Sequence, residues 1–95
     1  MSKKVQAVQR HRNENEVGGY LFFCPGCGEN HYFKVDSGGW TFNGDEENPT
    51  FSPSLLYPTK KVRCHLFLKK GKIQYLSDCG HELAGKTIDC PDWEE

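Results

Sequence analysis

The sequence lacks long apolar runs. Only 36% of its 95 residues are hydrophobic, and the mean hydropathy is −0.73. No stretch approaches the roughly 18 consecutive apolar residues that a membrane span needs, and the first residues lack the apolar segment of a signal peptide. We therefore expect a single soluble domain over 1–95 that is not secreted, has no membrane partner and has a thin core.

The sequence also lacks an excess of charge of either sign. Twelve basic residues balance thirteen acidic residues, for a net charge of −1. This balance argues against a protein that binds polyanions through bulk charge. The segment 60–72 is locally basic, because it carries six Lys or Arg residues and no acid. Contact between this basic hairpin and nucleic-acid backbone is therefore kept as an alternative function.

The sequence also lacks the even number of cysteines that is typical of a disulfide framework. The chain has five cysteines, and it shows no export signal. Both observations disfavour disulfides and favour a metal site.

Short β-prone runs between turn residues predict an all-β, antiparallel domain. A weak alternation over 3–9 indicates an edge strand, and the polar residues 10–16 indicate a loop or mobile segment. The only helical candidate, 81–85, is one turn long. We expect strands or extended segments at 20–24, 31–36, 40–43, 49–54, 55–57, 61–68, 73–78 and 86–90.

The clearest of these elements is a hairpin that turns at Lys70 and Gly71. A two-residue turn there pairs Leu68 with Ile73 and Leu66 with Tyr75. Alternation then separates an apolar face from a polar face. The apolar face ends with Cys64 and Cys79 close together, and the polar face places His65 diagonally opposite Asp78.

Cys24 and Cys27 lie in a C-P-G-C-G segment, which is typical of a zinc knuckle. A structural zinc ion needs four ligands, and the hairpin supplies the second pair as Cys64 and Cys79. The sequence therefore predicts one structural Zn²⁺ in a zinc-ribbon or rubredoxin-knuckle-like fold. His81 is the main alternative for the fourth ligand, and His31 is a weaker one. Iron is the alternative metal. Cys90 is expected to be a free thiol.

Two further groups of polar residues carry functional hypotheses. His65 beside Asp78, with His81 nearby, is typical of either a surface charge pair or a general-base arrangement. In the segment 49–54, alternation places Thr50, Ser52 and Ser54 on one side, near Trp40. That pattern is typical of an exposed strand over an aromatic core, and also of a groove for a peptide or small molecule.

The ordered motifs resemble a family of small bacteriophage and prophage zinc-knuckle proteins. The matching segments are C-P-G-C-G from Cys24, N-G-D, P-T-F-S-P-S, C-H, and G-x-I-Q-x-L-x-D-C-x-H-x-x-A-G-x-T, which ends at Thr87. The chain departs from that pattern at Gly80, where Thr is frequent, and in the short segment 57–63. Members are often labelled "ammonia monooxygenase", a label for large membrane-bound copper enzymes that this chain does not fit.

The resemblance implies a phage protein acting in the bacterial host cytoplasm, and it implies no secure activity. The leading hypothesis is a non-enzymatic zinc-binding module that engages a host, phage or defence protein. The second is a small zinc-dependent or His-Asp hydrolase that uses His65, Asp78 and His81. The third is a nucleic-acid-binding module that uses the hairpin 60–72.

Overall fold

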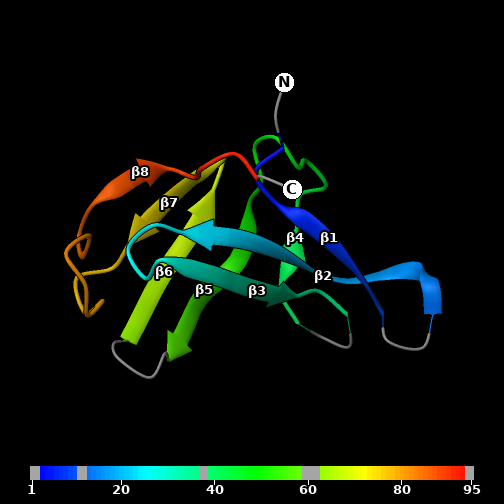
Figure 1. Cartoon of the computed structure of the whole chain (residues 1–95), viewed down its shortest axis with the longest axis horizontal. Coiled ribbons are helices and arrows are strands. Elements are labelled where there is room, and N and C mark those ends of the chain that lie inside the picture. Colours follow the sequence, from blue (N-terminus) through cyan, green and yellow to red (C-terminus); the bar gives the residue numbers. More distant parts are fainter. Residues whose placement is uncertain (1–2, 11–12, 37–38, 59–62, 94–95) are drawn as a thin grey trace.

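Eight strands form two antiparallel sheets in the computed structural model, which describes residues 3–10, 13–36, 39–58 and 63–93. The first sheet has the order β1-β2-β3 and the second β4-β5-β6-β7-β8 (Figure 1). The strands are β1 (Gln6–Arg10), β2 (Asn13–Cys24), β3 (Glu29–Lys34), β4 (Thr41–Phe42), β5 (Phe51–Pro58), β6 (Arg63–Lys69), β7 (Lys72–Tyr75) and β8 (Thr87–Asp89).

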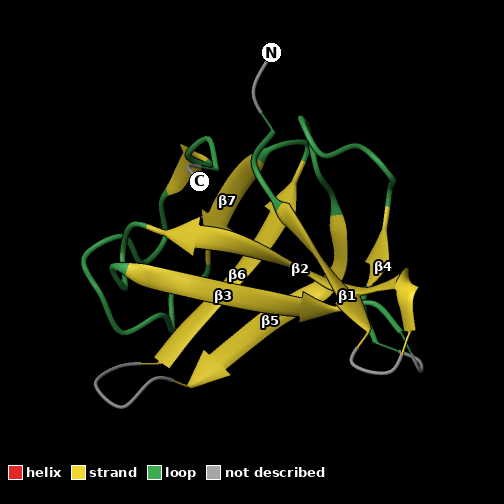
Figure 2. Cartoon of the chain, turned by 45° about the vertical axis from the view of Figure 1, so that its right-hand side comes forward, coloured by secondary structure: helices red, strands yellow, loops and turns green. Residues whose placement is uncertain are grey.

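The two sheets form two layers whose strands cross, with β2 and β3 passing over β5 and β6 in both views (Figures 1 and 2). The predicted all-β class is confirmed, since no helix occurs in the described residues. Consistent with this, none of these residues forms a helix long and apolar enough to cross a membrane.

Aromatic rings fill the space between the layers. Phe33 of β3 stacks on Phe51 of β5 with ring centroids 4.2 Å apart and planes 2° from parallel. Phe22 and Phe42 extend this stack on either side. This stack therefore joins the two sheets within a core that also buries Leu55, Leu66, Leu68, Ile73 and Tyr75.

The β6–β7 hairpin has the register that the sequence predicts. Leu66 pairs with Tyr75 and Leu68 with Ile73. Lys70 and Gly71 both have positive φ, at 50° and 78°, as a two-residue hairpin turn requires. Of the seven described positions on that face, six are buried, namely Cys64, Leu66, Leu68, Ile73, Tyr75 and Cys79, whereas Ser77 is exposed.

The N-terminal sheet departs from the expectation for 10–16. Strand β2 begins at Asn13 and runs through Gly18 and Gly19, so most of the predicted loop is strand. The glycines do not break the strand, because the Tyr32 ring packs against Gly19. A Cβ at that position would lie 2.3 Å from Cζ and from the hydroxyl oxygen of Tyr32. The prediction of a loop from the polar composition of 10–16 is therefore wrong for the residues that form the start of β2.

We predict that Phe33→Ala lowers the free energy of unfolding by about 3–5 kcal/mol, because it empties the centre of the ring stack. Phe23→Ala is the matched control: this ring is 37% exposed, so the cost should be below about 1 kcal/mol. Urea unfolding followed by tryptophan fluorescence measures both values. Equal costs for the two variants would contradict the proposed role of the stack.

Candidate functional site

Three polar side chains on the open face of the larger sheet form a continuous hydrogen-bonded chain. Ser54 Oγ lies 3.2 Å from His65 Nε2. His65 Nδ1 lies 3.1 Å from each carboxylate oxygen of Asp78. This order of hydroxyl, imidazole and carboxylate is the geometry of a Ser-His-Asp triad.

Neighbouring strands supply the three residues. In the β5–β6 register, His65 is opposite Leu56, which places Ser54 diagonally across from His65. On the other side of β6, the Leu76 amide donates to the His65 carbonyl at 2.9 Å, and Asp78 follows two residues later. The diagonal placement of His65 and Asp78 predicted from the hairpin is thus confirmed.

Ser54 sits where β5 is irregular. The register jumps between the Phe51–Leu68 pair and the Leu55–Leu66 pair, so three residues of β5 oppose one residue of β6. The Trp40 indole Nε1–H donates to the Ser54 carbonyl at 3.2 Å. That bond fixes the backbone of Ser54 in a segment that the sheet ladder does not hold.

Asp78 is partly exposed, with 47% of its side chain accessible against 24% for His65. The hydrogen bond from His65 is the main reason that the pKa of Asp78 lies below its ordinary value. Arg63 Nη1 adds a longer ion pair at 3.6 Å. An ionised Asp78 keeps the proton of His65 on Nδ1 and leaves Nε2 free to accept from the Ser54 hydroxyl.

A cluster of cysteine and histidine side chains lies below this face, inside the molecule. Cys24, Cys27, His31 and Cys64 bring their ligand atoms within 4.8 Å of one another. Cys24 Sγ is 3.8 Å from Cys64 Sγ and 3.1 Å from the Tyr75 hydroxyl. The predicted meeting of the C-P-G-C-G segment with Cys64 therefore occurs.

Cys79 and His81 form a second group with the same Cys64. His81 Nε2 lies 3.6 Å from Cys64 Sγ and 3.2 Å from Cys79 Sγ. The imidazole packs against Gly26, where a Cβ would lie 2.2 Å from the ring. Glycine at position 26 is therefore what lets the C-P-G-C-G segment approach this histidine.

The thiols perturb one another strongly. The hydrogen bond from Cys64 lowers the pKa of Cys24, and the same bond raises the pKa of Cys64. Burial, followed by repulsion from Cys24, raises the pKa of Cys27 to about 11. Without a bound cation, the cluster therefore favours a state in which only one of its thiols is ionised. Ionisation of several thiols together requires a cation beside them.

The other predicted residues have different roles. Thr50 Oγ1 accepts a hydrogen bond from the Lys70 amide at 2.8 Å. The Ser52 carbonyl accepts one from the Thr41 hydroxyl. Cys90 is buried away from the cluster, with its sulfur 4.0 Å from the Lys4 carbonyl. Four residues were predicted for binding, namely Trp40, Thr50, Ser52 and Ser54. Of these, Ser54 belongs to the triad, and Trp40 holds the Ser54 backbone.

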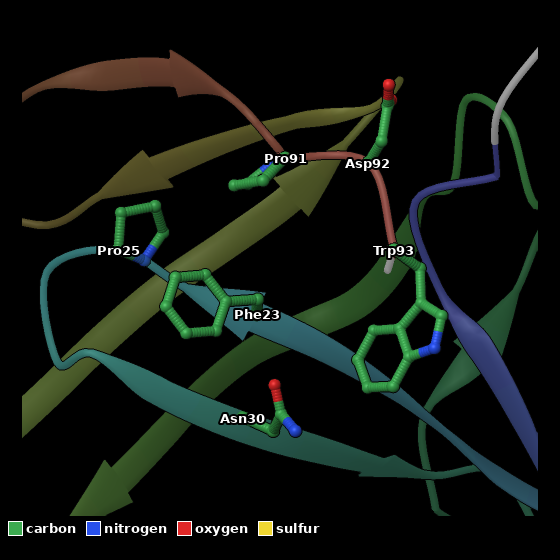
Figure 3. Close-up of a pocket in the computed structure, with 6 residues that line it drawn as sticks. All are labelled: Phe23, Pro25, Asn30, Pro91, Asp92 and Trp93. Carbon is green, nitrogen blue, oxygen red and sulfur yellow. The ribbon is translucent and has the colours of Figure 1, made fainter. Parts of the chain in front are cut away.

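A hollow of about 470 Å³ lies elsewhere on the surface, between the end of β2 and the C-terminal segment (Figure 3). The rings of Phe23 and Trp93 flank it, and no triad or cluster residue lines it. A second hollow, of about 590 Å³, borders His81 and Gly26. Neither hollow lies at Ser54.

The triad geometry defines the site as one of the serine-hydrolase type. The chain matches the family model BubE, described as a bacterial ubiquitination-like system serine protease, over residues 1–76. It therefore belongs to the BubE family. The match contains Ser54 and His65 and ends just before Asp78. No curated protein and no solved structure is similar enough to the chain to count as a match.

We predict that Cys90 resists alkylation in the folded protein. Its side chain is fully buried, and burial raises the pKa of its thiol to about 12, so little thiolate exists at pH 8. Iodoacetamide followed by peptide mass spectrometry should label Cys90 only after unfolding. Equal labelling rates in native and denatured protein would contradict this placement.

Proposed function

We propose that this protein is a serine protease of a bacterial ubiquitination-like system, with Ser54 as nucleophile, His65 as general base and Asp78 as the group that orients His65. The observation that carries the proposal is the chain of hydrogen bonds from Ser54 through His65 to Asp78. The family description, a serine protease of a bacterial ubiquitination-like system, supports the same chemistry.

The geometry supports acyl transfer in two steps. His65 Nε2 takes the hydroxyl proton as Ser54 Oγ bonds to the carbonyl carbon of the scissile bond, and the carbonyl electron pair moves onto its oxygen. The tetrahedral intermediate then collapses, and the leaving group departs with the proton from His65. Water, activated by the same imidazole, hydrolyses the acyl-serine and restores the hydroxyl.

Asp78 stabilises the imidazolium that forms during each step. Its two oxygens accept from Nδ1, so the ring keeps the orientation that presents Nε2 to Ser54. The second sequence-based hypothesis, a His-Asp hydrolase, is the nearest to this proposal. Its third residue, His81, faces the cysteines instead, and Ser54 takes its place in the chemistry.

We predict that a fluorophosphonate probe labels Ser54 covalently and that Ser54→Ala abolishes the labelling. Ser52→Ala is the matched control, because Ser52 precedes Ser54 by two residues and lies outside the triad. Asp78→Asn should slow labelling by at least about 100-fold, because the His65 tautomer is lost. Intact-protein and peptide mass spectrometry read out the adduct. Labelling that survives in Ser54→Ala would overturn the assignment.

We also propose that the cysteine cluster holds one structural Zn²⁺. Zinc–sulfur bonds of about 2.3 Å in a tetrahedron place two sulfurs about 3.8 Å apart. Cys24 and Cys64 have this separation. Three thiols and an imidazole are donors that zinc prefers, and a cation removes the mutual repulsion of the thiolates.

Cys24, Cys27 and Cys64 are the common part of every ligand set considered. Sequence reasoning places Cys79 fourth, with His81 or His31 as alternatives. The grouping of ligand atoms supports His31, because it lies within 4.8 Å of all three sulfurs. Bound zinc would link β2, β3 and β6 in a domain whose core is thin.

We predict about one zinc per chain by elemental analysis of protein purified under reducing conditions. Cys24→Ser should lose the metal and fold poorly, because metal binding and folding are coupled in small domains of this kind. Cys90→Ser should keep both the metal and the fold. A metal-free wild-type protein that folds normally would contradict the proposed centre.

The phage origin, the host-cell cytoplasm and a non-enzymatic role in binding a host or defence protein stay predictions from the sequence. Membership in a ubiquitination-like system is compatible with protein partners. For nucleic acid, the described part of the basic hairpin offers little support. Lys72 is paired with Asp89 at 2.6 Å, and Lys69 lies over the Phe67 ring.

A further inference from the structure

We propose that Cys64, Cys79 and His81 are positioning residues that hold the His65–Asp78 pair in its catalytic geometry. The inference rests on the proposed triad and extends it to side chains on the opposite face of the sheet. In this arrangement the thiol-imidazole group acts as a clamp beneath the two residues.

The first observation is adjacency along the chain. Cys64 precedes His65, and Cys79 follows Asp78. Asp78 lies in a turn closed by the Cys79 amide, which donates to the Leu76 carbonyl at 3.0 Å, whereas Cys64 and His65 are successive residues of β6, which point to opposite faces. The two cysteines point inward, at 0% and 7% exposure, while the dyad faces outward.

The second observation is how little else holds Asp78. Strand β7 ends at Tyr75, so the segment 76–80 lies beyond the regular ladder. Two backbone bonds tie it to β6, Leu76 N–H to His65 O at 2.9 Å and Gly80 N–H to Arg63 O at 2.7 Å. The Asp78 side chain is 47% exposed and is in contact with His65 and, in a longer ion pair, with Arg63.

The third observation is the clamp itself. His81 Nε2 contacts both Cys64 Sγ and Cys79 Sγ, at 3.6 and 3.2 Å. The His81 ring is wedged edge-on against Tyr75, with centroids 4.7 Å apart, and against Gly26. These contacts connect the end of segment 76–80 to the start of β6, next to both members of the dyad.

Loss of the clamp therefore has a local consequence. The segment 76–80 separates from β6, the Leu76 and Gly80 amides lose their acceptors, and Asp78 leaves His65. Ser54 stays in place because the Trp40 indole N–H holds its carbonyl. The nucleophile would remain, but its base would have lost its orientation.

The test uses the full chain as purified, with the variants Cys79→Ala and His81→Ala. Amide hydrogen exchange at Leu76 and Gly80 should accelerate about tenfold or more, while exchange at Ile73 in β7 stays unchanged. The nitrogen chemical shifts of the His65 ring, read at one pH, should move from the Nδ1–H tautomer toward the mixture of a free imidazole. Fluorophosphonate labelling of Ser54 should slow about tenfold.

Two control variants are matched to these changes. Cys90→Ala removes a buried thiol outside the group, and Glu82→Ala alters an exposed neighbour of His81. Neither should change the Leu76 and Gly80 amides or the His65 tautomer. Unchanged exchange and tautomer in Cys79→Ala and His81→Ala overturn the proposal. A uniform rise of exchange over all strands also overturns it, because the group would then be a global staple.

The exchange and tautomer measurements do not require an active enzyme. If the probe fails to label wild-type Ser54, the proposed protease function fails, while the clamp is still decided by these two readouts. If wild-type labelling succeeds and the readouts stay unchanged in the variants, only the clamp fails.

Discussion

The two-residue alternation of the β6–β7 hairpin is the constraint on which the rest of the site depends. The turn at Lys70 and Gly71 sets the register, and the register sends Cys64 inward and His65 outward. A slip of one residue would expose Leu66, Leu68 and Ile73 and bury charged neighbours. Because burying each such side chain contributes about 1.5–3 kcal/mol, the slipped pairing is strongly disfavoured. The burial energy of the core thereby selects the face on which His65, the proposed general base, appears.

Serine and its two partners are held by different means. His65 lies in the regular ladder of β6, and Asp78 lies just after β7. Ser54 instead lies in an irregular part of β5, where a hydrogen bond from Trp40 compensates for the missing ladder contacts. Trp40 also packs edge-on against Phe33 in the ring stack between the sheets. The nucleophile is thus connected to the aromatic core, whereas the base and the acid are connected to the cysteine cluster.

Local patterns predicted the hairpin, the faces of its strands, the pairing of His65 with Asp78 and the meeting of Cys24 with Cys64. The hairpin, its faces and the His65–Asp78 pairing follow from turn chemistry and from periodicity over a few residues, whereas the meeting of Cys24 with Cys64 follows from the four ligands that a structural zinc ion needs. The nucleophile could not be found in the same way. Ser54 reaches His65 only through the β5–β6 register, which contains a jump of three residues against one. The sequence offered His31 only as a weaker ligand candidate, across from Cys24 on the neighbouring strand, and its closeness to Cys64 appears only when the two sheets pack together. The polar residues at the start of β2 favoured a loop by composition. Composition alone does not show that the strand continues through Gly19, which lies against the Tyr32 side chain.

A thin core raises the question of how a small domain keeps three catalytic groups in place. In a two-layer fold, each strand residue has its chain neighbours on the opposite face. The outward positions next to a buried cross-link are therefore among the best-restrained exposed positions on the sheet. His65 occupies such a position beside Cys64 of the cluster, and Asp78, in the turn after β7, lies beside Cys79 of the second group. Precise placement of functional groups needs support from the side chains behind them. In the proposed arrangement, the cysteine and histidine side chains behind the sheet both stabilise the domain and orient the His65–Asp78 pair.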